Sequence, residues 1–210
     1  MSAIDDFQTY FTACPLVAII RGVRPDEAEA IGAAIYEAGI RIIEVPLNSP
    51  EPLESIGRLS ASLGDRALIG AGTVLDHAQV ADVKAAGGRL IVSPNTNVEV
   101  IEETVAAGLI SSPGFSTPSD AFDALEAGAH ALKLFPAEAA SPSVLKSLKA
   151  VLPTHVPVIV VGGITPDSME PWLQAGADGF GLGGGLYKPG QSPGETAKKA
   201  RAYVAAAGCG

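Results

Sequence analysis

The stretch from Val17 to Val45, VAIIRGVRPDEAEAIGAAIYEAGIRIIEV, contains the unit from which the rest of the chain is built. The apolar run Val17–Ile20 has the length of a buried strand and is followed by a break rich in Arg, Gly and Pro. The segment Pro25–Ala38 begins with proline and is followed by glycine, which is the usual asymmetry of a helix. A second apolar run, Ile40–Val45, then begins. The stretch therefore predicts a strand, a helix and a parallel strand.

This unit recurs along the chain. Eight apolar runs predict strands: Val17–Ile20, Ile40–Val45, Ala67–Ala71, Leu90–Val92, Leu109–Ser111, Ala131–Phe135, Val156–Val161 and Gly179–Gly183. The segments that follow them predict helices: Pro25–Ala38, Pro50–Ser62, Asp76–Ala86, Val98–Ala107, Pro118–Ala127, Pro142–Val151, Pro166–Ala175 and Pro193–Ala206. Eight such units predict a closed (β/α)8 barrel formed by a single domain, residues 1–210. An open flavodoxin-like or Rossmann sheet is the alternative, but no GxGxxG motif follows the first strand.

The composition excludes several classes of protein. The formal net charge is −9, which argues against non-specific nucleic-acid binding because such binding depends on neutralising phosphates. The N-terminus carries Asp5 and Asp6 in place of a basic signal-peptide region, and no apolar run approaches the roughly 20 residues that span a bilayer. We therefore expect a soluble, cytoplasmic protein without membrane or nucleic-acid partners. The terminal segments Met1–Phe7 and Ala205–Gly210 are expected to be loosely ordered.

No metal centre is predicted. Cys14 and Cys209 lie in neither a CxxC motif nor a Cys/His cluster, so they indicate no metal site and no disulfide framework. His77, His130 and His155 are scattered over predicted helix starts and loops, where we expect them to be structural or solvated.

Lys133 lies in the middle of a predicted buried strand, between Leu132 and Leu134. Burial lowers the pKa of a lysine, and a neutral amine is a nucleophile toward carbonyl carbon. Lys133 is therefore a candidate for Schiff-base formation. The alternative from this stretch alone is a lysine that reaches water or pairs with a carboxylate.

Polar residues at the carboxyl ends of the other strands complete the predicted site, because the active site of a parallel barrel forms at that end. Glu44, on the second strand, is placed to shuttle protons, directly or through a water molecule, if its apolar setting raises its pKa. Arg21, after the first strand, is suited to binding a carboxylate in bidentate fashion. Thr73, after the third strand, adds a hydroxyl donor.

Glycines follow the seventh and eighth predicted strands. Glycine allows backbone N–H groups to approach an anion closely, and these two loops are the recurring phosphate site of barrels. We expect four glycines to bind phosphate: Gly162, Gly163, Gly183 and Gly184. Together with the other residues they predict a Schiff-base enzyme acting on a small, phosphorylated keto acid.

Five segments carry a resemblance to a known family: Glu44–Pro50, Gly70–Val74, Ser112–Gly114, Lys133–Ala137 and Val161–Ile164. In this order and at this spacing they resemble the class I aldolases that cleave 2-keto-3-deoxy-6-phosphogluconate and its galactonate epimer. The resemblance extends from Pro15 to about Tyr203.

The resemblance implies a (β/α)8 barrel, a homotrimer, no metal or organic cofactor, and products pyruvate and glyceraldehyde 3-phosphate. It implies that Lys133 forms the Schiff base and that Glu44 is the general acid and base. It further implies that Thr73 helps to hold the pyruvyl carboxylate and that the four glycines hold the phosphate.

Three departures from the gluconate-type pattern concern specificity. Asn48 stands where gluconate-type enzymes usually have arginine, as in the galactonate-type branch, so carboxylate binding is expected to fall mainly to Arg21. Val161 replaces a threonine whose hydroxyl could distinguish the C4 configuration, and an apolar side chain rejects an epimer only weakly. Gly184 stands where relatives often have serine, which removes one hydroxyl contact to phosphate.

Three alternatives remain open at this point. The first is the same reaction on the gluconate epimer. The second is a phosphate-binding barrel without Schiff-base chemistry, and the third is a sugar-phosphate sensor without turnover. The presence of both Lys133 and Glu44 argues against the sensor, because binding alone requires no buried nucleophile.

Overall fold

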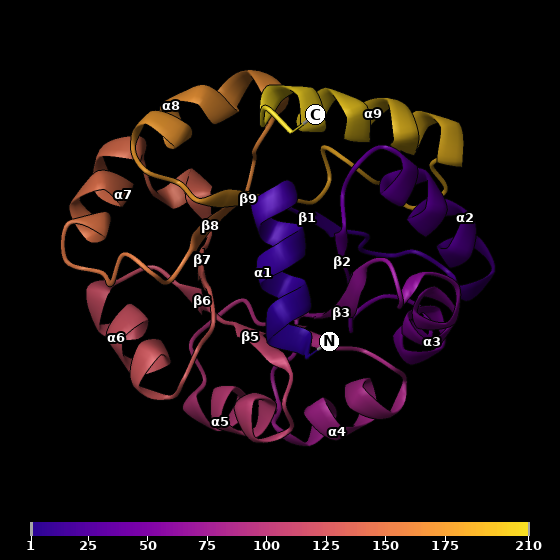
Figure 1. Cartoon of the computed structure of the whole chain (residues 1–210), viewed down its shortest axis with the longest axis horizontal. Coiled ribbons are helices and arrows are strands. Elements are labelled where there is room, and N and C mark those ends of the chain that lie inside the picture. Colours follow the sequence, from indigo (N-terminus) through magenta and orange to yellow (C-terminus); the bar gives the residue numbers. More distant parts are fainter. Residues whose placement is uncertain (1, 210) are drawn as a thin grey trace.

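The strands are parallel and follow one another in chain order around a ring (Figure 1). The computed structural model describes residues 2–209. Within that range the strands are β1 (Leu16–Ile19), β2 (Ile42–Pro46), β3 (Leu68–Gly72), β4 (Leu90–Val92), β5 (Ile110–Ser112), β6 (Gly114–Phe115), β7 (Leu132–Leu134), β8 (Val158–Val161) and β9 (Gly179–Leu182). Since β1 pairs with both β2 and β9, the first and last strands are neighbours.

The ring is closed through Pro113, which separates β5 from β6. β5 pairs with β4, whereas β6 pairs with β7. Proline has no N–H to donate to a neighbouring strand, so the ladder is interrupted there. The backbone N–H of Lys133 nevertheless donates to the carbonyl of Pro113, at 2.9 Å. β5 and β6 thus form one interrupted strand, and the predicted (β/α)8 barrel is confirmed.

Helices surround the barrel (Figure 1). Those outside the strands are α2 (Pro25–Glu37), α3 (Pro52–Leu63), α4 (Ala78–Ala85), α5 (Val98–Ala106), α6 (Pro118–Glu126), α7 (Pro142–Lys149), α8 (Met169–Gln174) and α9 (Pro193–Ala206). The predicted start of α3 at Pro50 was wrong because Glu51 has a left-handed φ of 41°. The 3-10 turn η2 (Pro166–Ser168) precedes α8 and shortens the predicted helix. None of the described helices has both the length and the apolar composition needed to cross a membrane.

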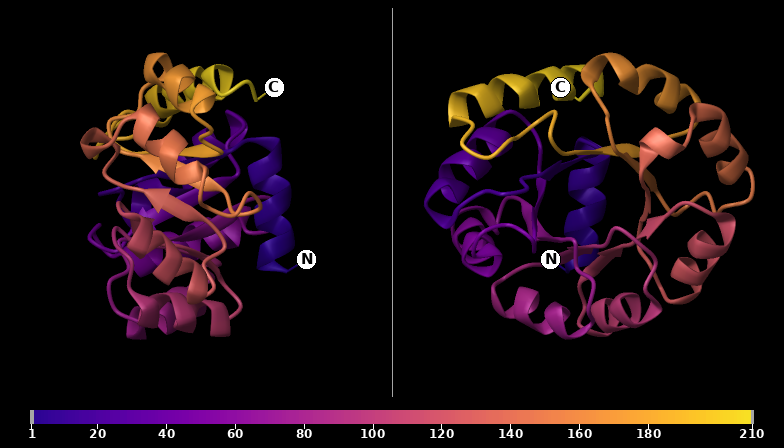
Figure 2. Two further views of the ribbon diagram at one scale, coloured as in Figure 1. Left: turned by 90° about the vertical axis from the view of Figure 1, so that its left-hand side faces the viewer. Right: turned by 180° about the vertical axis from the view of Figure 1, so that it is seen from behind.

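A further helix, α1 (Ala3–Ala13), lies across one end of the barrel (Figure 2). The predicted loose order of the N-terminal segment was therefore wrong from Ser2 onward. The hydroxyl of Ser2 accepts a hydrogen bond from the backbone N–H of Asp5, and the Asp5 carboxylate accepts one from the backbone N–H of Ser2, so the two residues cap the helix. At the other terminus α9 continues to Ala206, and Met1 and Gly210 lie outside the described residues.

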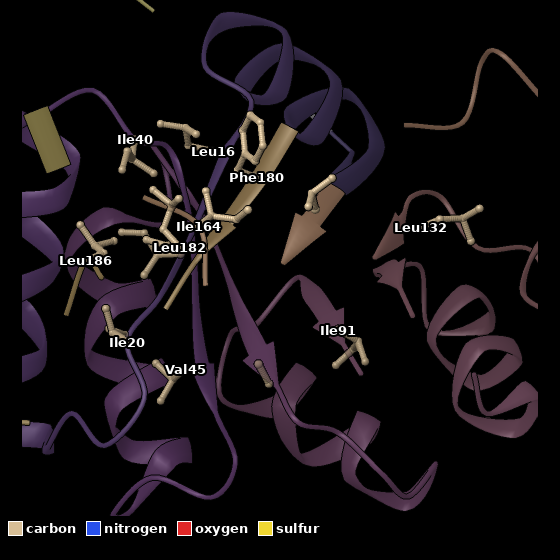
Figure 3. Packing of buried hydrophobic residues seen from close by; sticks show 14 of the residues in the cluster. Leu16, Ile20, Ile40, Val45, Ile91, Leu132, Ile164, Phe180, Leu182 and Leu186 are labelled. Carbon is tan, nitrogen blue, oxygen red and sulfur yellow. The ribbon is translucent and has the colours of Figure 1, made fainter. Parts of the chain in front are cut away.

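Two apolar clusters follow from the alternation of side chains along each strand. The outer cluster, between strands and helices, includes Leu16, Leu132 and Phe180, and part of it is seen in Figure 3. The inner cluster fills the barrel and includes Phe7 of α1 and Ile42. Outward-facing and inward-facing residues alternate along β2 and β7. This alternation directs the side chains of Glu44 and Lys133 into the barrel.

Candidate active site

Lys133 is enclosed by the barrel. It is flanked in the ladder by Gly114 of β6 and Ile159 of β8, and only 6% of it is exposed. Its Nζ lies 4.7 Å from the centre of the Phe135 ring, a cation–π contact. Burial lowers the pKa of Lys133, while the nearby Glu44 carboxylate opposes this and the Arg21 guanidinium adds to it. The direction agrees with the prediction, and it increases the fraction of neutral amine at neutral pH.

Glu44 is almost completely buried, with 1% of the residue exposed. Among residues 2–209 its Oε2 has no hydrogen-bond partner. Burial raises the pKa of Glu44 to about 7, against the opposing effects of the Lys133 and Arg21 charges. A carboxyl group with a pKa near neutrality is present in both protonation states at that pH, so it can both donate and accept protons.

The space for the Glu44 carboxylate is provided by Gly72, at the end of β3. A side-chain carbon added to Gly72 would overlap both carboxylate oxygens of Glu44. The absence of a side chain at this position is thus a requirement of the site. Sequence reasoning included Gly72 in a motif but had no signal for this contact.

Arg21, Asn48 and Thr73 come together from the loops after β1, β2 and β3. The Arg21 guanidinium donates to the Asn48 side-chain oxygen, and both of its terminal nitrogens lie 3.4 Å from the Thr73 hydroxyl. Thr73 has a φ of 55°, a left-handed conformation that β-branched residues rarely adopt and that is found mainly at functional positions. The cluster presents a guanidinium and a hydroxyl side by side, and a guanidinium is well suited to binding a carboxylate.

The predicted phosphate loops follow β8 and β9. Gly162 and Gly163 have φ values of 125° and 60°, so both occupy conformations that favour glycine. At Gly183 and Gly184 an added side-chain carbon would meet nothing within 4 Å, so these two positions face open space. The loop after β8 is fixed from α9, because the Tyr203 hydroxyl donates to the backbone carbonyl of Ile164 at 2.8 Å.

A cavity of about 620 Å³ at the carboxyl ends of the strands joins these groups. All of the predicted site residues except Glu44 line it: Arg21, Thr73, Lys133, Gly162, Gly163, Gly183 and Gly184. Glu44 lies deeper, in a small hollow that it shares with Lys133 and Phe7. Lys133 belongs to both spaces and therefore stands between the open cavity and the buried carboxylate.

The residues near the site that were not predicted include Glu138, Lys188 and Phe7. Glu138 and Lys188 line the cavity, from the loops after β7 and β9, and Phe7 closes the hollow beneath Glu44. The position of Lys188 shortly after the predicted glycine loop is a signal that could have been used. Phe7 reaches the site only through the packing of α1 on the barrel, which no local sequence pattern encodes.

Residues 2–209 contain no group of three or more His, Cys, Asp or Glu side chains arranged to hold a metal ion. The polar groups of the cavity are cations, hydroxyls, backbone N–H groups and the carboxylate of Glu138, and the carboxylate of Glu44 lies in the hollow beneath it.

Comparison with known proteins agrees with this geometry. The family model described as KDPG and KHG aldolase matches residues 7–192. The chain belongs to this aldolase family. Over 195 residues it is 49% identical to the 2-dehydro-3-deoxy-6-phosphogalactonate aldolase of Escherichia coli K12, covering 93% of this chain and 95% of the relative.

Two solved aldolase structures show the same architecture. The native KDPGal structure has a TM-score of 0.90 and 49% identity, covering 91% of this chain and 93% of that one. The KDPG aldolase of Legionella pneumophila, with pyruvate captured at low pH as a covalent carbinolamine intermediate, has a TM-score of 0.79 and 27% identity, covering 94% of each chain. The fold is thus shared across the family, while the identity to the galactonate-type relative is much the higher.

Proposed function

We propose that this chain is a Schiff-base aldolase that cleaves 2-dehydro-3-deoxy-6-phosphogalactonate to pyruvate and D-glyceraldehyde 3-phosphate. The observation that carries the proposal is the pairing of two oppositely shifted groups within one barrel. The pKa of Lys133 is lowered and that of Glu44 is raised, both chiefly by burial. Aldolase chemistry requires a neutral amine and a carboxyl group that exchanges protons at neutral pH.

The reaction begins at Lys133. Its neutral Nζ attacks the C2 ketone of the substrate and forms a carbinolamine, which loses water to give a protonated imine. Cleavage of the C3–C4 bond sends its electron pair into the imine and leaves an enamine on Lys133. The C4 hydroxyl loses its proton and becomes the aldehyde of glyceraldehyde 3-phosphate. Protonation of the enamine at C3, followed by hydrolysis of the imine, releases pyruvate and the free lysine.

Glu44 is proposed to handle the protons, either directly or through a water molecule. In its carboxylate form it takes the proton of the C4 hydroxyl during cleavage, and in its acid form it returns a proton to C3 of the enamine. The pKa of about 7 makes both forms accessible within one cycle at neutral pH.

The two ends of the substrate are assigned to opposite parts of the cavity. Arg21 and Thr73 are proposed to hold the C1 carboxylate, because the guanidinium and the hydroxyl lie within 3.4 Å of each other. The backbone at four glycines is proposed to hold the phosphate: Gly162, Gly163, Gly183 and Gly184.

We propose the galactonate epimer as the substrate for two reasons. The chain is 49% identical to the galactonate-type relative. In addition, Asn48 contacts Arg21 at a position where gluconate-type enzymes usually have a second arginine. Val161 lines the cavity with an apolar side chain, so we expect the gluconate epimer to be cleaved as well. Comparing kcat/KM for the two phosphorylated acids tests this preference.

The mechanism is tested by borohydride reduction in the presence of pyruvate, followed by peptide mass mapping. We expect a stable pyruvyl adduct on Lys133 and none in Lys133→Ala. The exposed Lys146 of α7 provides the control, since Lys146→Ala should leave the adduct unchanged. If pyruvate binds and no adduct forms, a phosphate-binding barrel without Schiff-base chemistry becomes the better description.

We also propose that residues 1–210 form one aldolase domain and that three copies assemble. The family resemblance supports the trimer, and so do three exposed apolar side chains: Phe122 on α6, Val144 on α7 and Val151 just after α7. Sedimentation equilibrium measures the mass of the assembly directly, and a monomer at micromolar concentration would contradict the trimer.

A further inference from the structure

Glu138 places a carboxylate inside the cavity. It lies five residues after Lys133 in the sequence, in the short 3-10 turn η1 (Ala137–Ala139) that follows β7. Its side chain is exposed and lines the same cavity wall as the glycine loops. No step of the proposed reaction uses it.

The carboxylate of Glu138 lies across the Gly162–Gly163 turn. A side-chain carbon added to Gly162 would overlap Oε2 of Glu138, and one added to Gly163 would lie 3.2 Å from Oε1. One carboxylate oxygen of Glu138 therefore lies next to each of the two adjacent glycines. Both glycines of this turn have positive φ values, and successive backbone N–H groups of a turn can bind an anion.

Glu138 forms no ion pair with any of the described residues. In the part of the chain that the structure describes, the ion pairs with N···O distances up to 4.0 Å involve other carboxylates. The cations that line the cavity are Arg21, Lys133 and Lys188, and their nitrogen atoms therefore lie more than 4.0 Å from the carboxylate oxygens of Glu138. A phosphate bound at the turn would meet an uncompensated like charge, and like charges at close range repel.

We propose that Glu138 competes with the substrate phosphate for the Gly162–Gly163 turn and thereby sets the affinity for phosphorylated ligands. The Glu138 carboxylate covers the turn in the structure. Phosphate binding requires the side chain to move away, and the repulsion between the two negative charges weakens that binding. Glu138 is in this sense a specificity-determining residue, which lowers the preference for a phosphorylated aldehyde over an unphosphorylated one. The proposal rests on the assignment of phosphate to these loops in the proposed function.

The test compares Glu138→Gln with the wild-type protein, because glutamine keeps the size of the side chain and removes its charge. Binding of inorganic phosphate is measured by calorimetry at low ionic strength. We expect the Kd for phosphate to fall by about three- to tenfold in Glu138→Gln, the range for one uncompensated charge near a partly exposed site. Glu103→Gln, on an exposed face of α5, serves as the matched control and should not change the Kd.

A second measurement uses the synthetic reaction of pyruvate with either glyceraldehyde 3-phosphate or glyceraldehyde. Glu138→Gln should lower KM for the phosphorylated aldehyde and leave KM for glyceraldehyde unchanged. An unchanged or weaker affinity for phosphate in Glu138→Gln would overturn the proposal. Failure of the aldolase assignment would show separately, as the absence of a pyruvyl adduct on Lys133, because phosphate binding is measured without turnover.

Discussion

The carboxylate of Glu44 occupies the space that a side chain on Gly72 would need. We therefore expect Gly72→Ala to displace the carboxylate and to lower kcat by about 10²- to 10⁴-fold, the usual contribution of a general acid–base. The added methyl group should also lower the free energy of unfolding by about 1–3 kcal/mol. Steady-state kinetics and urea unfolding measure the two effects.

Gly57→Ala is the matched control for this substitution. Gly57 lies within α3, and an added side-chain carbon there would come no closer than 3.8 Å to its nearest neighbour, the backbone oxygen of Ala86. Alanine favours a helix over glycine by roughly 0.5–1 kcal/mol, so this variant should be slightly more stable and fully active. Equal activity of the two variants would show that the Glu44 carboxylate does not depend on Gly72.

Glu44 should make the stability of the protein depend on pH. Burial raises its pKa from the ordinary 4.5 to about 7, so between these pH values the folded state binds more protons than the unfolded state. The free energy of unfolding therefore falls as the pH rises through this range and levels off above it, by roughly 3 kcal/mol. Glu44→Gln should lack this dependence, which urea unfolding at pH 4.5 and pH 8 measures as a difference between the two proteins.

The same variant separates proton transfer from imine formation. Glu44→Gln should cleave substrate slowly and still form some pyruvyl adduct on Lys133 in borohydride. If the stability of Glu44→Gln and that of the wild-type protein changed with pH in the same way, the raised pKa of Glu44 would be contradicted. An unchanged cleavage rate would instead mean that Glu44 is only a counter-ion for Lys133.

Arg21 should contribute mainly to carboxylate binding. A hydrogen bond to a charged group contributes about 1.5–3 kcal/mol, so Arg21→Ala should raise the Kd for pyruvate by roughly 10- to 100-fold. Calorimetry with pyruvate measures this Kd directly. Arg24→Ala is the control, since Arg24 forms exposed ion pairs with Asp26 and Glu27 at the start of α2. A similar Kd for the two variants would show that Arg21 does not bind the carboxylate.

Tyr203 should support the phosphate loop from α9. Tyr203→Phe removes the donor to the buried carbonyl of Ile164 and should cost about 1–3 kcal/mol, with a fall in Tm of about 2–4 °C for each kcal/mol. Loosening of this loop should also raise KM for the phosphorylated substrate while leaving pyruvyl-adduct formation intact. Tyr36→Phe, which keeps its ring 3.9 Å from the Arg41 guanidinium carbon, should change neither KM nor adduct formation.

Much of the fold could be predicted because the residues that specify each strand and helix lie close together in the sequence. Each βα unit carries its own apolar run, its proline and its terminal glycine, and repetition of that unit specifies the barrel. Helix α1 has no preceding strand and stands outside this repetition, so the pattern did not reveal it. Its capping signal, Ser2 followed by Asp5, is present in the sequence, but the docking of Phe7 inside the barrel is a tertiary contact.

The candidate site could be predicted to the same extent. Strand ends are recognisable in the sequence, and polar residues at those ends are brought together by any closed parallel barrel. The contact between Gly72 and Glu44, the left-handed Thr73 and the carboxylate of Glu138 over the glycine turn depend on distances between separate loops. No periodicity in the sequence records such distances.

The position of α1 has a consequence for the order of events during turnover. Phe7 lines the buried hollow next to Glu44 and Lys133, whereas the glycine loops line the open cavity on the other side of Lys133. If Lys133 holds pyruvate at the inner end of the open cavity, the phosphorylated aldehyde lies between pyruvate and the glycine loops. The aldehyde must then leave first and pyruvate second. In the synthetic direction the order is reversed, and pyruvate has to enter before the aldehyde.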